Sequence, residues 1–249
     1  MRPYHPLLLR LVSALSLLLA WQLAAWWWAS SLLPTPAAVI GLILRDTLAG
    51  GLLHDLGATL RRVGLAFVIA MLVGSMIGIL MGRRRTADLL LDPWLMLFLN
   101  VPALVVIILA YVWFGLAEST AVFAIALNKI PNVAVTLREG ARTLDQDYLE
   151  MARSFRIGRR KTFIYVTLPQ LLPYFAVAAR SGLALIWKVV LVVELLGRND
   201  GIGFELHLFF QLFDVTGILA YSLAFILVML AIEYGLLQPL ERAANRWRR

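Results

Sequence analysis

The stretch that decides the fold is a basic segment, residues 150–169, which reads EMARSFRIGRRKTFIYVTLP and lies between two hydrophobic runs. Met151, Phe155 and Tyr165 place apolar and aromatic groups among its arginines, and Gly158 predicts a break between two short helical pieces. A short helix that displays aromatic anchors between charged flanks suits docking to another protein. The alternative is a basic loop that binds only anionic lipid and fixes the topology, and composition alone favours it.

The composition of the whole chain is that of a membrane protein. Of its 249 residues, 61% are hydrophobic and 15% are charged, whereas a soluble domain has about 45–50% and about 25%. A protein with several spans needs this excess, because side chains that face lipid must also be apolar. The net charge of +8 comes from basic residues between the apolar runs, so we ascribe it to orientation in the membrane and expect no nucleic acid. The lack of cysteine excludes disulfides and thiol catalysis.

Six windows come near the length of about 20 apolar residues that crossing the hydrocarbon requires. They predict an all-α fold with one transmembrane domain over residues 1–249. The first window ends in Trp26, Trp27 and Trp28, which fits an interfacial aromatic belt and an uncleaved helix better than a signal peptide. The windows are roughly 11–28, 63–81, 94–116, 120–137, 171–196 and 218–237.

Arginine and lysine set the predicted orientation. They cluster at the amino end, after the second and fourth windows, and in the carboxyl tail, which six spans would place on one side. By the positive-inside rule that side is the cytoplasm, and both termini lie there. Arg61 and Arg62, at the outer end of the second window, are the discordant pair, which Asp55 offsets in part.

Two shorter segments are expected to lie at the outer interface. Thr35 and Pro36 supply a helix cap and a first-turn proline, and Gly50-Gly51 ends that helix before it is long enough to span. The segment 197–217 is rich in Leu and Phe and is broken by glycines, which predicts a partly re-entrant outer helix.

Glycines and prolines within the windows predict how the helices meet. Gly74, Gly78 and Gly82 share one face at four-residue spacing, which permits the close approach of another helix. That helix belongs either to the same chain, which is the favoured interpretation, or to a second subunit. Pro102 and Pro131 lie inside the third and fourth windows and predict kinks.

Polar side chains inside the windows are the candidate pathway residues. A charge at mid-membrane costs roughly 2.5–3.5 kcal/mol on insertion scales, so it usually faces a cavity or a partner charge. Lys129 and Lys188 either make a cavity attractive to an anion or form a structural ion pair with Glu194, and we slightly favour the ion pair. The full candidate set is Asn128, Lys129, Asn132, Lys188 and Glu194, the two asparagines sharing one helix face.

The segment 150–169 resembles the coupling loop of ABC importer permeases, whose pattern is Glu-Ala-Ala, then Gly, then Ile-x-Leu-Pro. Glu150, Ala152 and Leu168-Pro169 match, Val166 stands for Ile, and Arg156 stands at the glycine position, two residues before Gly158. Almost the whole chain is similar to permeases of binding-protein-dependent importers with the type I (methionine/molybdate-like) fold, in the nitrate/sulfonate/taurine branch. The other marks are Trp113-Phe114-Gly115, Gly140, Asp145, Glu194-Leu195-Leu196 and Gly201-Ile202-Gly203.

The resemblance implies that this chain carries out no covalent chemistry. It therefore implies no catalytic residue. The loop is implied to be a short helix that docks into a groove on an ATPase subunit. The residues to which it assigns ATPase coupling are Glu150, Met151, Ala152, Phe155, Arg156, Gly158, Leu168 and Pro169. The implied complex has two permeases as a homodimer, two ATPase subunits and an outer substrate-binding protein, in a bacterial inner membrane.

Substrate and cofactors follow from the same resemblance. The branch implies a small anion as substrate, such as a sulfonate, taurine or nitrate. ATP and Mg²⁺ are assigned to the ATPase subunit, because this chain has no phosphate-binding Gly-x-x-x-x-Gly-Lys-Ser/Thr loop. We expect no cofactor bound by this chain.

Two other classes of function have less support. His5, His54 and His207 are scattered outside the windows, and the chain has no His-Glu-x-x-His or Gly-x-Ser-x-Gly motif, so we expect neither a metal site nor an enzyme. A channel or secondary transporter without an ATPase is the alternative. Such proteins often use intramembrane acids or inverted repeats, and Glu194 is the only strong candidate acid.

Overall fold

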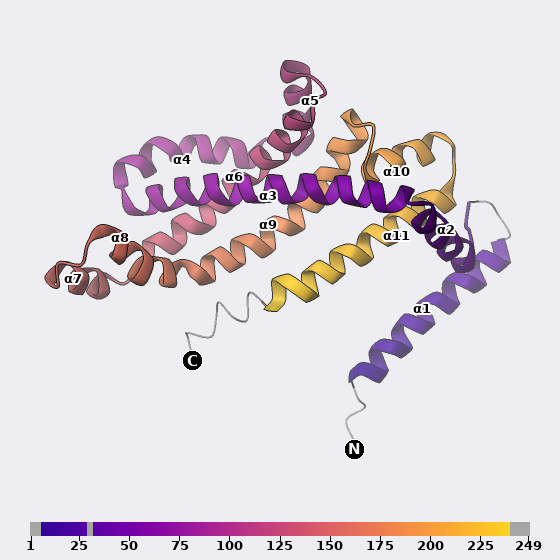
Figure 1. The fold of residues 1–249 in the computed structure, drawn as a ribbon, viewed down its shortest axis with the longest axis horizontal. Helices are drawn as coiled ribbons and strands as arrows, with labels where there is room; N and C mark the ends of the chain where they lie inside the picture. The colour runs from indigo at the N-terminus through magenta and orange to yellow at the C-terminus, as the bar shows by residue number, and fades with distance from the viewer. Residues whose placement is uncertain (1–5, 29–31, 240–249) are drawn as a thin grey trace.

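The computed structural model describes residues 6–28 and 32–239, and these fold into helices with no strand among them (Figure 1). This confirms the predicted all-α fold class. The π-helical turns η1 and η2 continue a neighbouring α-helix. In chain order the elements are α1 Pro6–Trp28, α2 Pro36–Ala49, α3 Gly51–Arg83, α4 Arg85–Asn100, α5 Ala103–Phe114, α6 Glu118–Arg142, α7 Gln146–Ser154, α8 Arg159–Thr162, η1 Phe163–Thr167, α9 Leu168–Gly197, α10 Ile202–Gln211, α11 Val215–Ile232 and η2 Glu233–Leu237.

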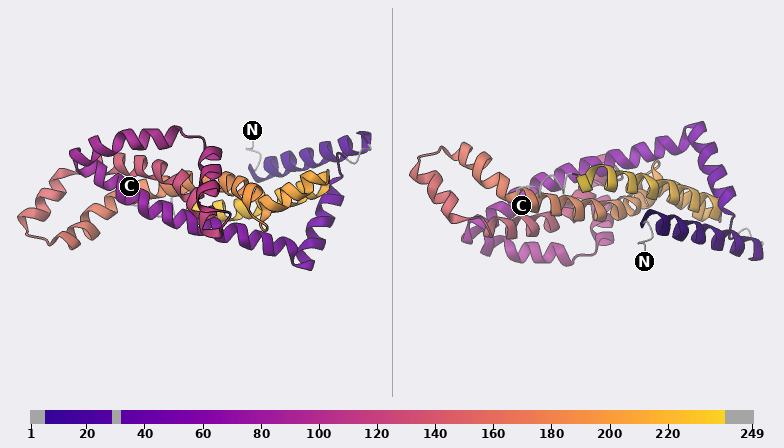
Figure 2. Two further views of the ribbon diagram at one scale, coloured as in Figure 1. Left: turned by 90° about the horizontal axis from the view of Figure 1, so that it is seen from above. Right: turned by 90° about the horizontal axis from the view of Figure 1, so that it is seen from below.

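The long helices α3, α6, α9 and α11 form one elongated bundle (Figure 1). α3 packs along α6, α6 packs along α9, and the short α10 contacts both α9 and α11. Apolar side chains from these helices meet in a core that includes Ile125, Ile186 and Phe225. α1 lies outside the bundle and reaches it through α2 (Figures 1 and 2).

Four of the described helices are long and apolar enough to cross a membrane by themselves. They are Gly51–Arg83, Glu118–Arg142, Arg159–Gly197 and Val215–Leu237, and they contain the second, fourth, fifth and sixth predicted windows. The first window lies in α1, where the apolar stretch with described side chains is Leu15–Trp27. The third window lies in α4 and α5, which are long and apolar enough only together, as a broken span or a re-entrant loop.

The kink predicted in the window 94–116 is a sharp break between two helices. α4 begins at Arg85, and α5 leaves it with a bend of 98°. The cause is Pro102, which has no N–H to donate and whose ring pushes Val101 into the extended conformation, with φ −72° and ψ 125°. Pro131 has a milder effect, because α6 continues through it.

The two predicted interfacial segments are helices. α2 is capped as expected, because the Thr35 Oγ1 accepts a hydrogen bond from the Ala38 N–H at 3.3 Å. Gly50 ends this helix with a φ of +87°, a conformation that glycine adopts without strain. α10 follows the glycine-containing turn after α9.

The helix α3 begins at Gly51, well before the start at Val63 of the window that it contains. A hydropathy window misses this part because its polar side chains, Asp55, Thr59 and Arg62, are buried in protein. They therefore do not meet lipid, and the helix can begin in polar surroundings.

Charged residues on α3 and α6 mark a band of membrane thickness. At about 1.5 Å per residue, Arg62 and Arg83 are about 32 Å apart along α3, and Glu118 and Arg138 are about 30 Å apart along α6. Both spacings match a hydrocarbon core of about 30 Å. We call the end of the bundle with Arg83 and Arg138 the hairpin end, and the end with Arg62 and Glu118 the far end.

Close contact between α3 and α6 depends on three glycines of α3. A Cβ at Gly74 would lie 2.7 Å from the Val133 Cβ, and a Cβ at Gly78 would overlap the backbone carbonyl of Ala134. Gly82 is equally close to α6. The glycine face predicted from the four-residue spacing therefore meets a helix of the same chain.

We expect Gly78→Ala to destabilise the folded chain, because the new methyl group meets backbone that cannot rotate away. Overpacking of this kind costs about 1–3 kcal/mol, against a gain in helix propensity of about 1 kcal/mol. Gly57→Ala is the matched control on the same helix, since a Cβ there meets no other described element within 4 Å. Thermal unfolding in detergent should give a lower midpoint for Gly78→Ala than for Gly57→Ala. Equal midpoints would contradict the packing.

Candidate functional site

A helical hairpin, residues 145–170, projects beyond the hairpin end of the bundle (Figure 1). Its first arm is α7, and its second arm is α8, which runs through η1 into α9 without a break. Asp145 caps the first arm, because its Oδ1 accepts a hydrogen bond from the Asp147 N–H at 2.9 Å. The sequence therefore builds a short, capped helix in the position predicted for the docking loop.

The hairpin is fixed to α9 at its base. Leu149 and Ala152 are buried, and Leu149 belongs to an apolar cluster with Leu171. The Gln170 side chain joins the two arms: its Oε1 accepts from the Asp145 N–H at 2.9 Å, and its Nε2 donates to the Val166 carbonyl oxygen at 3.0 Å. A movement of α7 therefore has to move the start of α9.

The chain that leads into the hairpin is fixed in the same way. The Thr143 hydroxyl and the Tyr174 hydroxyl are hydrogen-bonded at 2.8 Å. The Tyr174 ring lies over Gly140, where a Cβ would stand 2.5 Å from the ring. The glycine at this position is required because α6 and α9 cross closely here.

Leu168 and Pro169 lie where the second arm becomes α9. Pro169 has no N–H, and its ring crowds the carbonyl of Tyr165, four residues earlier. The chain widens into the π turn η1 directly before it, with the Leu168 N–H bonded to the Phe163 carbonyl, so the helix continues despite the proline. Both residues are half-buried and so belong to the base of the hairpin.

The turn at the tip of the hairpin uses Arg156 in the left-handed conformation, with a φ of +51°. The Arg156 N–H bonds to the Arg153 carbonyl and the Ile157 N–H bonds to the Ala152 carbonyl, each at 2.9 Å. This pattern is the Schellman helix ending, which normally has glycine at the left-handed position. Gly158, with a φ of −60°, only begins α8. The turn is therefore at the place where the importer pattern has glycine and is not shifted to Gly158.

The tip presents apolar and basic side chains to solvent. The side chains of Phe155 and Tyr165 are 76% and 75% exposed, and Met151 is 43% exposed. Glu150 also lies on this surface. The exposed basic side chains are Arg153, Arg156, Arg159, Arg160 and Lys161. An exposed aromatic group of this size on a rigid, well-anchored helix is typical of a docking surface.

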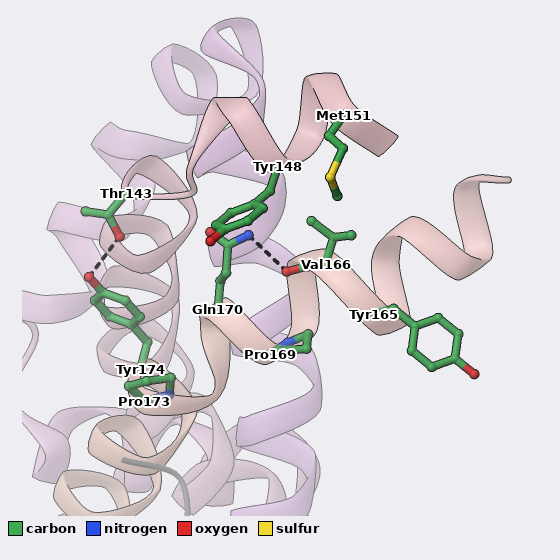
Figure 3. Close-up of a pocket in the computed structure, with 9 residues that line it drawn as sticks. All are labelled: Thr143, Tyr148, Met151, Tyr165, Val166, Pro169, Gln170, Pro173 and Tyr174. Carbon is green, nitrogen blue, oxygen red and sulfur yellow. Dashed lines mark hydrogen bonds between the residues drawn. The ribbon is translucent and has the colours of Figure 1, made fainter. Parts of the chain in front are cut away.

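A cavity of about 720 Å³ lies between the two arms of the hairpin (Figure 3). Tyr148 from the first arm and Gln170 from the second are among the residues that line it (Figure 3). The lining includes Thr143 and Tyr174, so the cavity reaches the base of the hairpin.

The far end of the bundle is held by a buried guanidinium. The Arg62 side chain is fully buried, and its Nη1 donates to the Glu194 Oε1 at 2.7 Å. Its Nε and Nη2 donate to the two carboxylate oxygens of Glu118 at 3.0 and 2.9 Å, and it also pairs with Asp200. Arg198 joins the cluster through Glu118 at 3.0 Å. The cluster ties α3, α6 and α9 together.

Glu194 explains the glycines that follow α9. Its Oε2 accepts hydrogen bonds from the Thr59 hydroxyl and from the Gly203 N–H, both at 2.9 Å. A Cβ at Gly201, whose φ is +100°, would lie 2.6 Å from the Glu194 carboxylate and 2.7 Å from the Arg62 Nη1. The motif Glu194-Leu195-Leu196 with Gly201-Ile202-Gly203 is therefore a carboxylate and the turn that closes over it.

The two mid-span lysines have different surroundings. Lys129 is 3% exposed, and its stem lies against Gly182 of α9, where a Cβ would stand 2.9 Å from the Cε. Lys188 is exposed in the isolated chain. Within the described part of the chain, neither lysine has an ion pair or a hydrogen bond. Asn128 and Asn132 are half-buried on α6.

The ion pair that we favoured for Glu194 has a different partner. Neither Lys129 nor Lys188 reaches this carboxylate, and Arg62 takes their place. Glu194 is fully buried beside Arg62, and its place on the translocation pathway stays a prediction. Sequence reasoning missed Arg62 because it counted only as an exception to the positive-inside rule. The available signal was a cation at the outer end of a span together with Glu118 and Glu194 at the outer ends of two others.

The geometry agrees with comparison to known proteins. Residues 70–234 match the family described as the binding-protein-dependent transport system inner membrane component. The chain belongs to this family. It is therefore an inner-membrane permease component of an ABC transporter, and the predicted resemblance is confirmed.

Relatives of this permease lie in the expected branch. It is 30% identical to a putative aliphatic sulfonates transport permease protein of Escherichia coli strain K12, over 91% of this chain and 87% of the relative. It is also 30% identical to the taurine transport system permease protein of the same strain, over 92% of this chain and 87% of that protein.

A solved structure shares the fold. A chain of the crystal structure of an amino acid ABC transporter with histidines superimposes with a TM-score of 0.64, at 21% identity, over 80% of this permease and 96% of that chain. The type I permease fold is thereby shown. Among residues 6–28 and 32–239, no group of three or more His, Cys, Asp or Glu side chains is arranged to hold a metal.

We expect Arg62→Met to destabilise this permease strongly, because it leaves the fully buried Glu194 without its cation. Breaking a buried pair from one side costs about 3–5 kcal/mol. Arg61→Met is the matched control, because the neighbouring Arg61 side chain is 60% exposed and pairs only with Glu118, a contact worth about 1 kcal/mol or less. Unfolding midpoints in detergent measure both. A loss for Arg61→Met as large as that for Arg62→Met would contradict the role of burial.

We expect Arg156→Gly to stabilise the hairpin turn relative to Arg156→Ala. Both changes remove the guanidinium, but only glycine relieves the left-handed backbone, which costs a side-chain residue about 1–2 kcal/mol. Hydrogen exchange of the hydrogen-bonded amides at positions 156 and 157 is the measurement, with slower exchange in the glycine variant. Equal exchange in both variants would show that the turn carries no such strain.

Proposed function

We propose that this permease, with a second copy of itself, forms the membrane path of an ATP-driven importer, and that its α7–α8 hairpin docks to a separate ATPase subunit. The supporting observation is the hairpin itself: a base locked to α9 and a tip with an exposed aromatic residue, Phe155, among basic side chains. The roles of Glu150, Met151, Ala152, Phe155, Arg156, Gly158, Leu168 and Pro169 in ATPase coupling belong to this proposal, with Ala152, Leu168 and Pro169 acting through the base.

The fold supplies a direct mechanical connection for this coupling. Gln170, Leu149 and Leu171 join α7 to the start of α9, and α9 runs as one helix to Glu194 at the far end. A shift of the hairpin on the ATPase therefore moves a rigid helix over its whole length. ATP-driven approach of two ATPase subunits would move two such helices, one in each permease copy, and change which side of the membrane the path faces.

The proposed orientation follows the basic residues. The hairpin end carries the basic tip together with Arg83 and Arg142, so we place it and both termini in the cytoplasm. The far end then faces outward, where a substrate-binding protein delivers the solute. ATP and Mg²⁺ are bound by the ATPase subunits, and this permease holds no cofactor.

The proposed substrate is a small oxyanion of the sulfonate class. The support is that the relatives in this branch are named for aliphatic sulfonates and taurine. The exposed mid-span Lys188, which would attract an anion, agrees with this class.

The first experiment is gentle extraction of this permease from its native membrane and mass spectrometry of the proteins that come with it. An ATPase subunit in stoichiometric amount, together with a binding protein, is the expected result. A chain recovered only with itself, and able to transport in vesicles without ATP, would replace the importer by a channel or secondary transporter.

We expect Phe155→Ser to lower the amount of ATPase subunit that co-purifies, by about tenfold, because a large exposed aromatic group at an interface centre is worth about 1–3 kcal/mol. Phe210→Ser is the matched control: this phenylalanine is 64% exposed but lies in α10 at the far end. It should leave the ATPase bound. Equal retention of ATPase in both variants would remove the hairpin tip from the proposed interface.

A further inference from the structure

We infer that Lys188 is the anion-recognition residue of the membrane path, in a site shared between two copies of this permease and fitted to one small oxyanion. The inference rests on the proposed importer function and extends it to the residue that selects the charge of the substrate. The inference assigns different roles to Lys188 and Lys129, which the sequence alone does not distinguish.

Lys188 lies at the centre of an exposed stripe on α9. At 3.6 residues per turn, the exposed residues of this stripe fall within about 100° of arc. The stripe extends for about 27 Å along the helix at about 1.5 Å per residue, close to the thickness of the hydrocarbon core. Its members are Val177, Ser181, Ala184, Leu185, Lys188, Val192 and Leu195.

Lipid is an unsuitable neighbour for this stripe. Lys188 lies about 9 Å along α9 from Glu194, which pairs with Arg62 at the far edge of the band, so Lys188 is inside the hydrocarbon thickness. Side chains on a helix also lean toward its N-terminus, which here directs the ammonium further into the membrane. An unpaired ammonium at this depth needs water or an anion, so the stripe faces an aqueous space.

Within the described residues, the best-defined cavities do not include Lys188. The interior between α6 and α9 is packed, with Ile125 and Ile186 each 1% exposed. The cavity of the hairpin and the apolar groove along α3 and α9 are both lined by other residues. The missing wall of the path is therefore a second copy, whose α9 presents the same stripe.

A two-fold arrangement turns one lysine into a two-cation site. The symmetry that relates two copies places both Lys188 side chains at the same depth on opposite sides of the axis. Two ammonium groups that face each other across a narrow space favour an anion between them, and N–H donors suit the oxygens of a sulfonate. Lys129 has no such place, because its side chain is buried inside one chain against Gly182.

The natural chain has no cysteine, which makes this site testable by single-cysteine chemistry. The sample is the Lys188→Cys variant in the assembled transporter, purified with its ATPase and binding protein and reconstituted in vesicles. Radiolabelled taurine and ethanesulfonate are the transport probes. We expect uptake to fall about tenfold, which corresponds to about 1.4 kcal/mol.

Modification of the new thiol then separates charge from structure. Aminoethyl methanethiosulfonate adds back an ammonium and should restore most of the uptake, while the sulfonatoethyl reagent adds a negative charge and should not. Lys188→Arg should keep most of the uptake without any reagent. Leu72→Cys is the control for access: it is 62% exposed and lies inside the band, about 15 Å along α3 from Arg62, and it should not react with these water-soluble reagents.

Cross-linking tests the shared site. A series of bifunctional methanethiosulfonate reagents of increasing length should join two copies of Lys188→Cys, and failure at every length would overturn the two-copy site. Uptake unchanged by Lys188→Cys, or a thiol as unreactive as that of Leu72→Cys, would overturn the anion site. If either test fails while Phe155→Ser still releases the ATPase, the proposed importer function remains and only the Lys188 site is overturned. If no ATPase co-purifies with the permease, both the importer function and the Lys188 site are overturned.

Discussion

A buried guanidinium determines how the far end of this permease is built. Arg62 has no contact with solvent, so each of its donors needs an acceptor, and the acceptors come from Glu118, Glu194 and Asp200. Removing any of these groups from water is costly, and the cost is offset only when the whole cluster is assembled. The positions of the α6 start, the α9 end and the turn before α10 are therefore not independent of one another.

This constraint gives α9 a fixed point at each end. At the far end Glu194 is held by Arg62, Thr59 and the Gly203 amide, and at the hairpin end Gln170 holds both arms of the hairpin. Between these points the helix is uninterrupted. A helix that is anchored at both ends transmits displacement along its axis, since its hydrogen-bonded backbone resists shortening and its packed neighbours resist bending.

Hydropathy and capping rules were sufficient for most of the fold, because they depend on local chemistry. Thr35 caps α2 as its position predicts, and Gly78 meets α6 as its spacing predicts. The failures have a common cause in long-range contacts. Pro102 marked the place of the bend, but the early start of α3 depends on surroundings that only the folded chain supplies. Arg62 was misread for the same reason, since its meaning lies in acids that are more than fifty residues away.

The hairpin and the mid-span residues show two limits of reading function from residue types. At the hairpin tip, Arg156 adopts the left-handed backbone conformation for which the importer pattern has glycine. The pattern therefore specifies the conformation of the turn and does not require glycine to form it. Within the membrane, a helix face that borders an aqueous path and a helix face that borders lipid have nearly the same apolar composition. Composition therefore does not separate the two. The apolar side chains around Lys188 carry no information on this point. One ammonium at mid-depth does, because lipid offers it neither water nor a counter-charge. Lys129 in the same chain is buried, so the position of each lysine on its helix, and not the residue type, separates the two.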